Sequence, residues 1–156
     1  MNAMILLVLL TLKGEGGLPK VNFVEFPDVP ACEKKAEKLS TILAEAGYRV
    51  LESPCVMGIQ HFTPHKRAKK GEARPEAKYL YLVALDDQRV LAMPRHDREK
   101  CLREAIERGK KSGGRVRYYC AVSDQALIDD RVYDIEKRRA IRRRYYEEQR
   151  KKSGAR

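Results

Sequence analysis

The sequence has almost none of the short motifs by which catalytic and metal-binding sites are usually recognised. Its four cysteines form no CxxC or CxxH pair, so we do not expect a zinc site. The glycine-rich stretch 14–17 lacks the Lys-Ser/Thr sequel of a phosphate-binding loop. We therefore expect no metal, no cofactor and no catalytic residues, and we predict a non-enzymatic protein.

Carboxylate clusters and positioned histidines, which phosphodiester chemistry needs, are also scarce. Adjacent aspartates occur only at 86–87 and 129–130, where a hairpin turn and the first turn of a helix explain them. Two histidines on one loop could act as acid and base in a ribonuclease-like mechanism, although the sequence does not fix their geometry. The chain offers only three for this alternative: His61, His65 and His96.

No apolar run approaches the ~20 residues that a membrane-spanning helix requires. The run Met1–Leu12 has no positive charge before it and no small-residue cleavage site after it. We predict that it is a buried strand and that the chain has no membrane span. A signal-like segment stays open as an alternative.

Acidic residues are scarce in two segments of the chain, and the net charge of +11 is concentrated there. Residues 61–78 hold six basic and two acidic groups, and residues 131–156 hold eleven and four. The remaining parts of the chain are nearly neutral. Condensed positive charge predicts a polyanionic partner, with nucleic acid ahead of an anionic membrane or an acidic protein surface. The alternative is a solvated basic surface without a partner.

The order of the apolar segments predicts an α+β fold of tandem duplicated ββαβ units. The first unit, residues 1–60, has strands at 4–12 and 21–26, a helix after Asp28 and a strand at 48–55. The second, residues 78–123, repeats this with strands at 78–85 and 89–93, a helix after Asp97 and a strand at 115–120. The first strand of each unit is apolar on both faces, which predicts antiparallel three-stranded sheets in the order 2-1-3 with one helix each.

Basic segments complete the predicted organisation, with a linker loop at 61–77 and a C-terminal helix with a basic arm at 124–156. Leu127, Ile128, Val132 and Ile135 recur at helical spacing, so we expect the helix to begin near Ala126 and to pack this stripe on the core. Phosphates can be bound by cations of both segments, and Tyr145 can stack on bases. The candidate binding residues are Lys66, Arg67, Lys69, Lys70, Arg138, Arg139, Arg142, Arg143, Arg144, Tyr145, Arg150, Lys151 and Lys152.

The cysteines stand at matching places in the two units, one in the helix and one at the end of the last strand. The distance along the helix from its cysteine to the helix end is similar to the distance along the following strand to its cysteine. Both are about 20 Å in the first unit and about 17 Å in the second. The pairs Cys32–Cys55 and Cys101–Cys120 are therefore within bonding reach. A chain without a convincing export signal favours reduced, buried thiols, and disulfides stay open as the alternative.

The sequence thus favours a basic accessory protein that binds DNA or RNA through phosphate contacts, within a nucleoprotein or virion-type assembly. We expect it in the cytoplasm or in such a particle. One alternative is an inhibitor or assembly component whose basic arm binds an acidic protein surface. Another is a secreted or periplasmic disulfide-stapled module.

Overall fold

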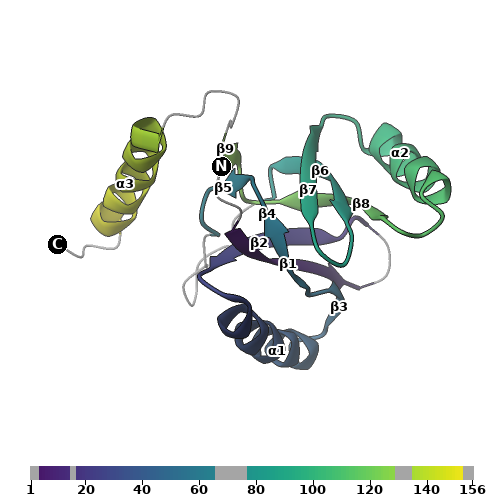
Figure 1. Ribbon diagram of the computed structural model, residues 1–156, viewed down its shortest axis with the longest axis horizontal. Helices are drawn as coiled ribbons and strands as arrows, with labels where there is room; N and C mark the ends of the chain where they lie inside the picture. The colour runs from purple at the N-terminus through teal and green to yellow at the C-terminus, as the bar shows by residue number, and fades with distance from the viewer. Residues whose placement is uncertain (1–3, 15–16, 66–76, 129–134, 153–156) are drawn as a thin grey trace.

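The computed structural model of the protein describes residues 4–14, 17–65, 77–128 and 135–152, and shows an α+β fold around one mixed sheet (Figure 1). A C-terminal helix follows the sheet, as predicted. In chain order the elements are β1 (Met4–Lys13), β2 (Lys20–Phe26), α1 (Val29–Glu45), β3 (Tyr48–Glu52), β4 (Cys55–Gly58), β5 (His61–Phe62), β6 (Tyr79–Leu85), β7 (Val90–Arg95), α2 (Arg98–Lys111), β8 (Arg117–Ser123), β9 (Leu127–Ile128) and α3 (Ile135–Lys152).

The main sheet has seven strands in the order β3-β1-β2-β8-β6-β7, with β4 also paired to β1. In each half, the first strand lies between its hairpin partner and the strand that follows the helix. The two halves share one sheet, because β2 and β8 pair in parallel at Lys20 and Val122, a pairing that the predicted order within each unit does not include. This repeated order is a likeness in arrangement, and the internal duplication itself stays a prediction.

The strand predicted at 48–55 is divided into β3 and β4, which pair one after the other with the same edge of β1. Pro54 explains the division, because it has no N–H to contribute to a ladder. Its carbonyl still accepts a hydrogen bond from the N–H of Val8 at 3.1 Å. The register of β1 with β3 shifts between Leu10 and Thr11, next to this break.

The sheet curves so that its two ends meet. Met57, in β4, forms a parallel bridge with Arg89 at the start of β7, and the amide of Gln60 bonds both the N–H and the C=O of Ala92 at 2.7 Å. Alternate residues of β1, β2 and β6 face the enclosed side and form the inner core with β4, β7 and β8. Its buried members are Leu6, Val8, Leu10, Val21, Phe23, Val56, Phe62, Tyr81, Val83, Leu85, Val90, Ala92 and Ala121.

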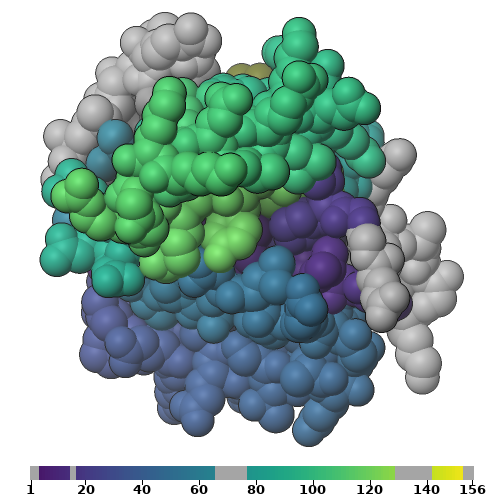
Figure 2. Space-filling view, turned by 90° about the vertical axis from the view of Figure 1, so that its right-hand side faces the viewer, coloured from purple at the N-terminus to yellow at the C-terminus, as the bar shows by residue number. Residues whose placement is uncertain are grey.

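Both body helices lie on the outer side of the curved sheet (Figure 1). Cys32 and Ala36 of α1 pack on Leu7, and a corresponding cluster joins α2 to β6 and β8. Figure 2 shows the α2 half, in green, above the α1 half, in blue. This two-sided cover explains why β1 and β6 are almost entirely apolar.

Both predicted cysteine pairs are bonded, so the expectation of reduced thiols is wrong. Cys32–Cys55 ties α1 to β4 with a Cα–Cα distance of 6.0 Å, and Cys101–Cys120 ties α2 to β8 with 5.6 Å. The partners are those that helix rise and strand rise predict. The absence of a convincing export signal had favoured reduced thiols.

The expected helix over Ala126–Lys152 begins later than predicted. Leu127 and Ile128 form the short strand β9, which pairs with Phe62 and His61 of β5, and the described helix α3 begins at Ile135. Val132 lies outside the described residues, as do Asp129 and Asp130. The apolar pair at 127–128 therefore packs as a strand beside the curved sheet, because β5 offers it a backbone edge.

Candidate nucleic-acid interface

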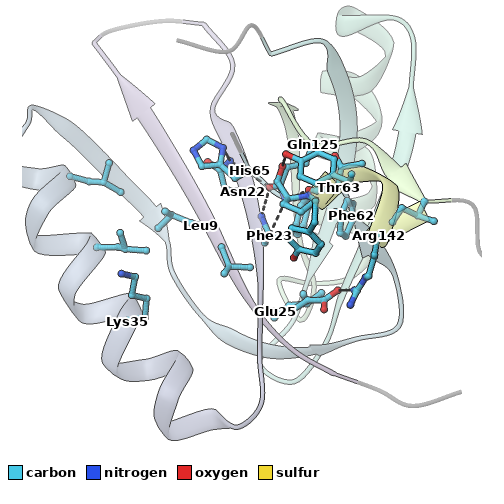
Figure 3. Close-up of a pocket in the computed structure, with 18 residues that line it drawn as sticks. Leu9, Asn22, Phe23, Glu25, Lys35, Phe62, Thr63, His65, Gln125 and Arg142 are labelled. Carbon is cyan, nitrogen blue, oxygen red and sulfur yellow. Dashed lines mark hydrogen bonds and ion pairs between the residues drawn. The ribbon is translucent and has the colours of Figure 1, made fainter. Parts of the chain in front are cut away.

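A groove of about 540 Å³ lies between α1, β2, the segment 62–65 and α3 (Figure 3). Its volume is within the range of about 300–1,000 Å³ that is usual for pockets that hold small ligands. Lys35 of α1 lies on one side of it and Arg142 of α3 on the other. In this groove, described residues of the body and of the basic helix present a common surface to a ligand.

The α1 wall of the groove consists of Lys35, Leu39 and Leu43, which follow one another at a spacing of four residues. At a rise of 1.5 Å per residue, this wall is about 12 Å long. The Cys32 end of the helix is clamped to the sheet by its disulfide, whereas Leu39 and Leu43 are only half-buried. Ala46, which follows the last residue of α1, is exposed, so the helix leaves the sheet towards its C-terminus.

Aromatic rings form a rigid base beneath the opposite wall. Phe23 and Phe62 stack with their centroids 3.9 Å apart and their planes within 6° of parallel. The ring of Tyr81 meets both of them edge-on, at 6.3 and 6.0 Å. Such packing holds Phe62, and with it the segment 62–65, in one position against the sheet.

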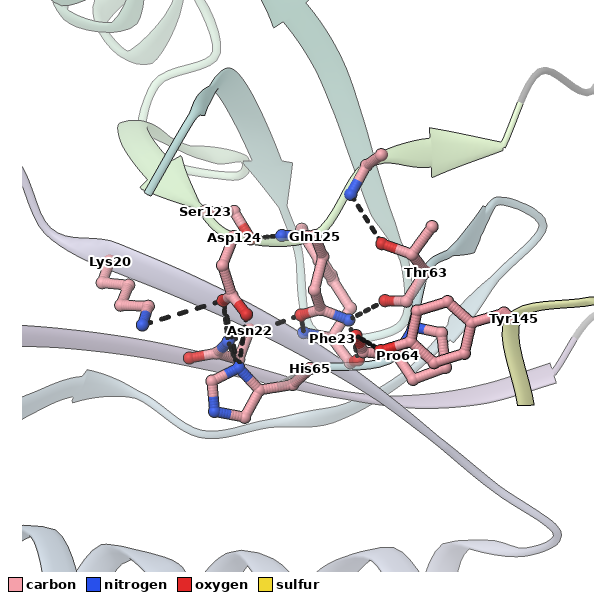
Figure 4. Close-up of polar contacts among 11 residues, drawn as sticks. Lys20, Asn22, Phe23, Thr63, Pro64, His65, Ser123, Asp124, Gln125 and Tyr145 are labelled. Atoms are coloured by element: carbon pink, nitrogen blue, oxygen red, sulfur yellow. Dashed lines mark hydrogen bonds and ion pairs between the residues drawn. The ribbon is translucent and has the colours of Figure 1, made fainter. Parts of the chain in front are cut away.

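The side chain of Gln125 replaces the missing part of the ladder between β2 and β8 (Figure 4). These strands pair only at Lys20, so the backbone of Phe23 would be left without partners. The N–H of Phe23 donates to Gln125 Oε1 at 2.8 Å, and Gln125 Nε2 donates to the carbonyl oxygens of Phe23 and Thr63, both at 2.8 Å. With 1% of its surface exposed, Gln125 is a buried polar group whose amide is satisfied at both ends.

A buried carboxylate anchors the end of the segment 62–65. The side chain of Asp124 is 3% exposed and lies 2.8 Å from His65 Nδ1 and 3.7 Å from Lys20 Nζ. The amide nitrogen of Asn22 donates to the same carboxylate at 3.2 Å. His65, predicted to belong to a linker loop, is therefore fixed to the two strands that join the halves of the sheet (Figure 4).

Helix α3 is attached to the body along one stripe of half-buried residues, Arg142, Tyr145 and Gln149. Arg142 Nη2 lies 2.5 Å from Glu25 Oε1 and 3.0 Å from His61 Nδ1. The Tyr145 hydroxyl donates to the carbonyl oxygen of Pro64 at 3.2 Å (Figure 4). Burial, assisted by the negative charge of Asp124, raises the pKa of the Tyr145 phenol, so this donor stays protonated at neutral pH.

The other faces of α3 point away from this stripe and carry cations. Arg143, Arg144, Arg150, Lys151 and Lys152 are all exposed. Residues seven apart lie on nearly the same side of a helix, so Arg143 with Arg150 and Arg144 with Lys151 form two rows, each about 10.5 Å long. The exposed Glu147 and Glu148 lie between the cations of these rows, so the charge of this surface is a positive excess rather than a purely cationic row. Positive charge is thereby presented along the helix, on the surface that the body does not cover.

The structure brings together only some of the residues that the sequence singled out. Arg142 is tied to Glu25, which removes one of the predicted phosphate ligands from the exposed set. Tyr145 is committed to Pro64 and is half-buried, so it is not an open stacking surface. The predicted ligands of the basic loop lie outside the described residues: Lys66, Arg67, Lys69 and Lys70. The side chains of Arg138 and Arg139, in the first turns of α3, are also not described.

Lys35, Leu39, Leu43 and Tyr146 line the groove but were not predicted to belong to a site. The spacing of Leu39 and Leu43 reads equally well as core packing, and Tyr146 differs from Tyr145 only in the side of the helix on which it falls. The position of Tyr146 among the arginines was the one sequence feature that could have indicated a base-stacking residue.

Comparison with protein-family models, with curated proteins and with solved structures found no significant match. Within the described ranges, no group of three or more histidines, cysteines or carboxylates is placed to hold a metal ion. No described helix is long and apolar enough to cross a bilayer. The charge and shape of the groove and of α3 are therefore the features that indicate a function.

Proposed function

We propose that the protein binds nucleic acid through phosphate contacts made by the exposed cations of α3. The observation that supports this most directly is that one side of α3 attaches to the body and the other side exposes cations. Its inward stripe attaches to the body, while Arg143, Arg144 and Lys151 remain exposed on the other side. A helix held in this way presents a fixed row of charge to a polyanion at little further cost in conformational entropy.

Binding of this kind has a measurable signature in its dependence on salt. Each neutralised phosphate releases condensed counterions, so log K falls with log[salt] by about 0.9 per contact on duplex DNA and about 0.7 on a single strand. Four exposed cations of α3 are replaced by glutamine in the test variant: Arg143→Gln, Arg144→Gln, Lys151→Gln and Lys152→Gln. We expect weaker binding and a salt slope that is shallower by up to about 3.

A matched control removes the same net charge from a different helix. The exposed cations of α2 are changed in the control variant: Lys100→Gln, Arg103→Gln, Lys110→Gln and Lys111→Gln. If α3 is the interface, this variant keeps most of the affinity and slope of the native protein. Equal losses in both variants would show that only total charge matters and would refute the assignment to α3.

Two disulfides favour a second proposal, which concerns the place of action. Disulfides persist outside the reducing cytosol, in exported proteins and on virion surfaces. We therefore propose that the protein works in an oxidising compartment or on a particle exposed to one. Alkylation of the purified protein without reductant should add no mass, whereas alkylation after reduction should modify all four cysteines. Free thiols in protein isolated from its native source would refute this.

A further inference from the structure

The groove beside α3 has the properties of a site for a flat, largely apolar ring between positive charges. Half-buried leucines of α1 form one wall, and Phe62, Pro64 and two tyrosines of α3 form the other. Lys35 stands on the α1 side (Figure 3). A ligand that enters from the surface would therefore meet apolar side walls and a cation at the rim.

Tyr146 supplies the exposed ring that a stacking ligand needs. It is 55% exposed and packs edge-on against Tyr145, with ring centroids 5.9 Å apart and an angle of 86° between the planes. Tyr145 is itself held by its hydrogen bond to Pro64. The exposed ring of Tyr146 thus lies at the groove beside a tyrosine that is itself held in place.

Cations flank this ring on the same helix. Arg143 precedes Tyr146 by three residues and Arg150 follows it by four, which places both beside it on the helix surface. Arg143 and Arg150 are exposed. A base on Tyr146 would thus have Arg143 and Arg150 beside it along α3 and Lys35 across the groove, which suits the phosphates that flank every base in a strand. Of the nearby carboxylates, Glu25 is paired with Arg142, and Glu147 is exposed next to the ring.

We propose that the groove binds an unpaired nucleobase, so that the protein prefers single-stranded nucleic acid over duplex. The base stacks on Tyr146 beside the leucine wall of α1, and the flanking phosphates lie on the cations of α3. A paired base is held inside the duplex stack and cannot enter without the cost of unpairing. This inference rests on the proposed function and names the form of nucleic acid that it takes.

The same geometry predicts weak sequence preference. Gln125 uses both ends of its amide within the chain, and the amide nitrogen of Asn22 donates to Asp124. These groups are therefore engaged and do not read base edges. Stacking tolerates any base, because every base has a π face.

The test compares three fluorescent probes of equal length in an anisotropy titration at low salt. They are a single-stranded oligothymidylate, a duplex, and a single strand of abasic residues with the same number of phosphates. We expect the oligothymidylate to bind about 5- to 150-fold more tightly than the abasic strand, which is the range for loss of one stacked base. The duplex should bind more weakly than the oligothymidylate.

Variants then assign this difference to the groove. Tyr146→Ala should abolish most of the preference for bases over abasic residues while leaving the affinity for the abasic strand nearly unchanged, and Tyr146→Phe should retain it. Tyr79→Ala, at an exposed tyrosine of β6, serves as the matched control and should have no effect.

The outcomes separate the two proposals. Salt-dependent binding of all three probes with equal affinity, or tighter binding of the duplex, overturns the base site and leaves the phosphate interface intact. Failure to bind any probe at low salt overturns both. Binding of an acidic, tyrosine-containing peptide in place of every oligonucleotide would also overturn both and would identify an acidic protein as the ligand.

Discussion

Removal of one disulfide should destabilise the fold by an amount that follows from its position in the chain. Cys32 and Cys55 are 23 residues apart, and Cys101 and Cys120 are 19 apart. The loop-closure relation for the unfolded chain gives about 3.4 kcal/mol for the first bond and about 3.2 kcal/mol for the second at 25 °C. For a chain of this length, a loss of about 3 kcal/mol lowers Tm by roughly 6–12 °C.

The assay is urea unfolding, followed by circular dichroism, of the native protein and of two double variants. Cys32→Ala/Cys55→Ala and Cys101→Ala/Cys120→Ala should each lose about 3 kcal/mol, and full reduction should remove about 6–7 kcal/mol. That total is comparable with the whole stability of a typical domain, about 5–15 kcal/mol, so the reduced protein should be close to unfolding. Reduced native protein separates loss of the cross-link from loss of the buried sulfur atoms.

Hydrogen exchange adds a test of location. Each bond ties one helix to one strand, so loss of Cys32–Cys55 should speed exchange in α1 before α2, and loss of the other bond should do the reverse. Unfolding of both double variants within about 1 kcal/mol of the native protein, or an equal rise of exchange in both helices, would contradict this role of the disulfides.

Three further changes test the body of the fold. Gln125→Leu leaves buried backbone groups of Phe23 and Thr63 without partners and should cost at least about 3 kcal/mol in urea unfolding, whereas the exposed Gln88→Leu should cost less than about 0.5 kcal/mol. Gly58→Ala places a methyl group against the buried side chain of Leu6 and should cost about 1–3 kcal/mol, seen as a lower midpoint with an unchanged m-value. Burial raises the pKa of Tyr81 to about 12 from 10.0. The protonated phenol therefore contributes its full stabilisation below pH 10 and loses it as the pH rises towards 12. Tyr81→Phe should flatten this alkaline loss of stability, which urea unfolding at about pH 8–11 measures.

Local signals explain why the body of the fold was predictable. Asp28 caps α1 through Ala31 N at 2.8 Å, and Asp97 caps α2 through Lys100 N at 3.1 Å, as their positions before apolar helical patterns indicated. Gly47 ends α1 with a φ of +89°, a conformation that residues with a Cβ rarely adopt. These features depend on neighbours within a few residues, so the sequence contains them directly.

The parts that were missed depend on residues far apart in the chain. Leu127 and Ile128 have helical spacing, yet they form a strand because β5 lies beside them. Gln125 looked like an ordinary polar residue, although its hydrogen bonds cross about one hundred positions to Phe23. Residues of α1, α3 and the segment 62–65 line the groove together. Their arrangement depends on the tertiary fold, so no local sequence pattern predicts it.

Synthesis on the ribosome places a particular demand on a sheet whose enclosed side is filled from both halves of the chain. When residues 1–65 have emerged, Leu6, Val8 and Phe23 still lack the side chains of β6 and β7 that will cover them. The nascent first half therefore carries uncovered apolar side chains until β8, which joins the halves and ends at Ser123, has left the exit tunnel. Completion of the sheet, rather than either half alone, should be the event that makes the newly made chain soluble and resistant to proteases.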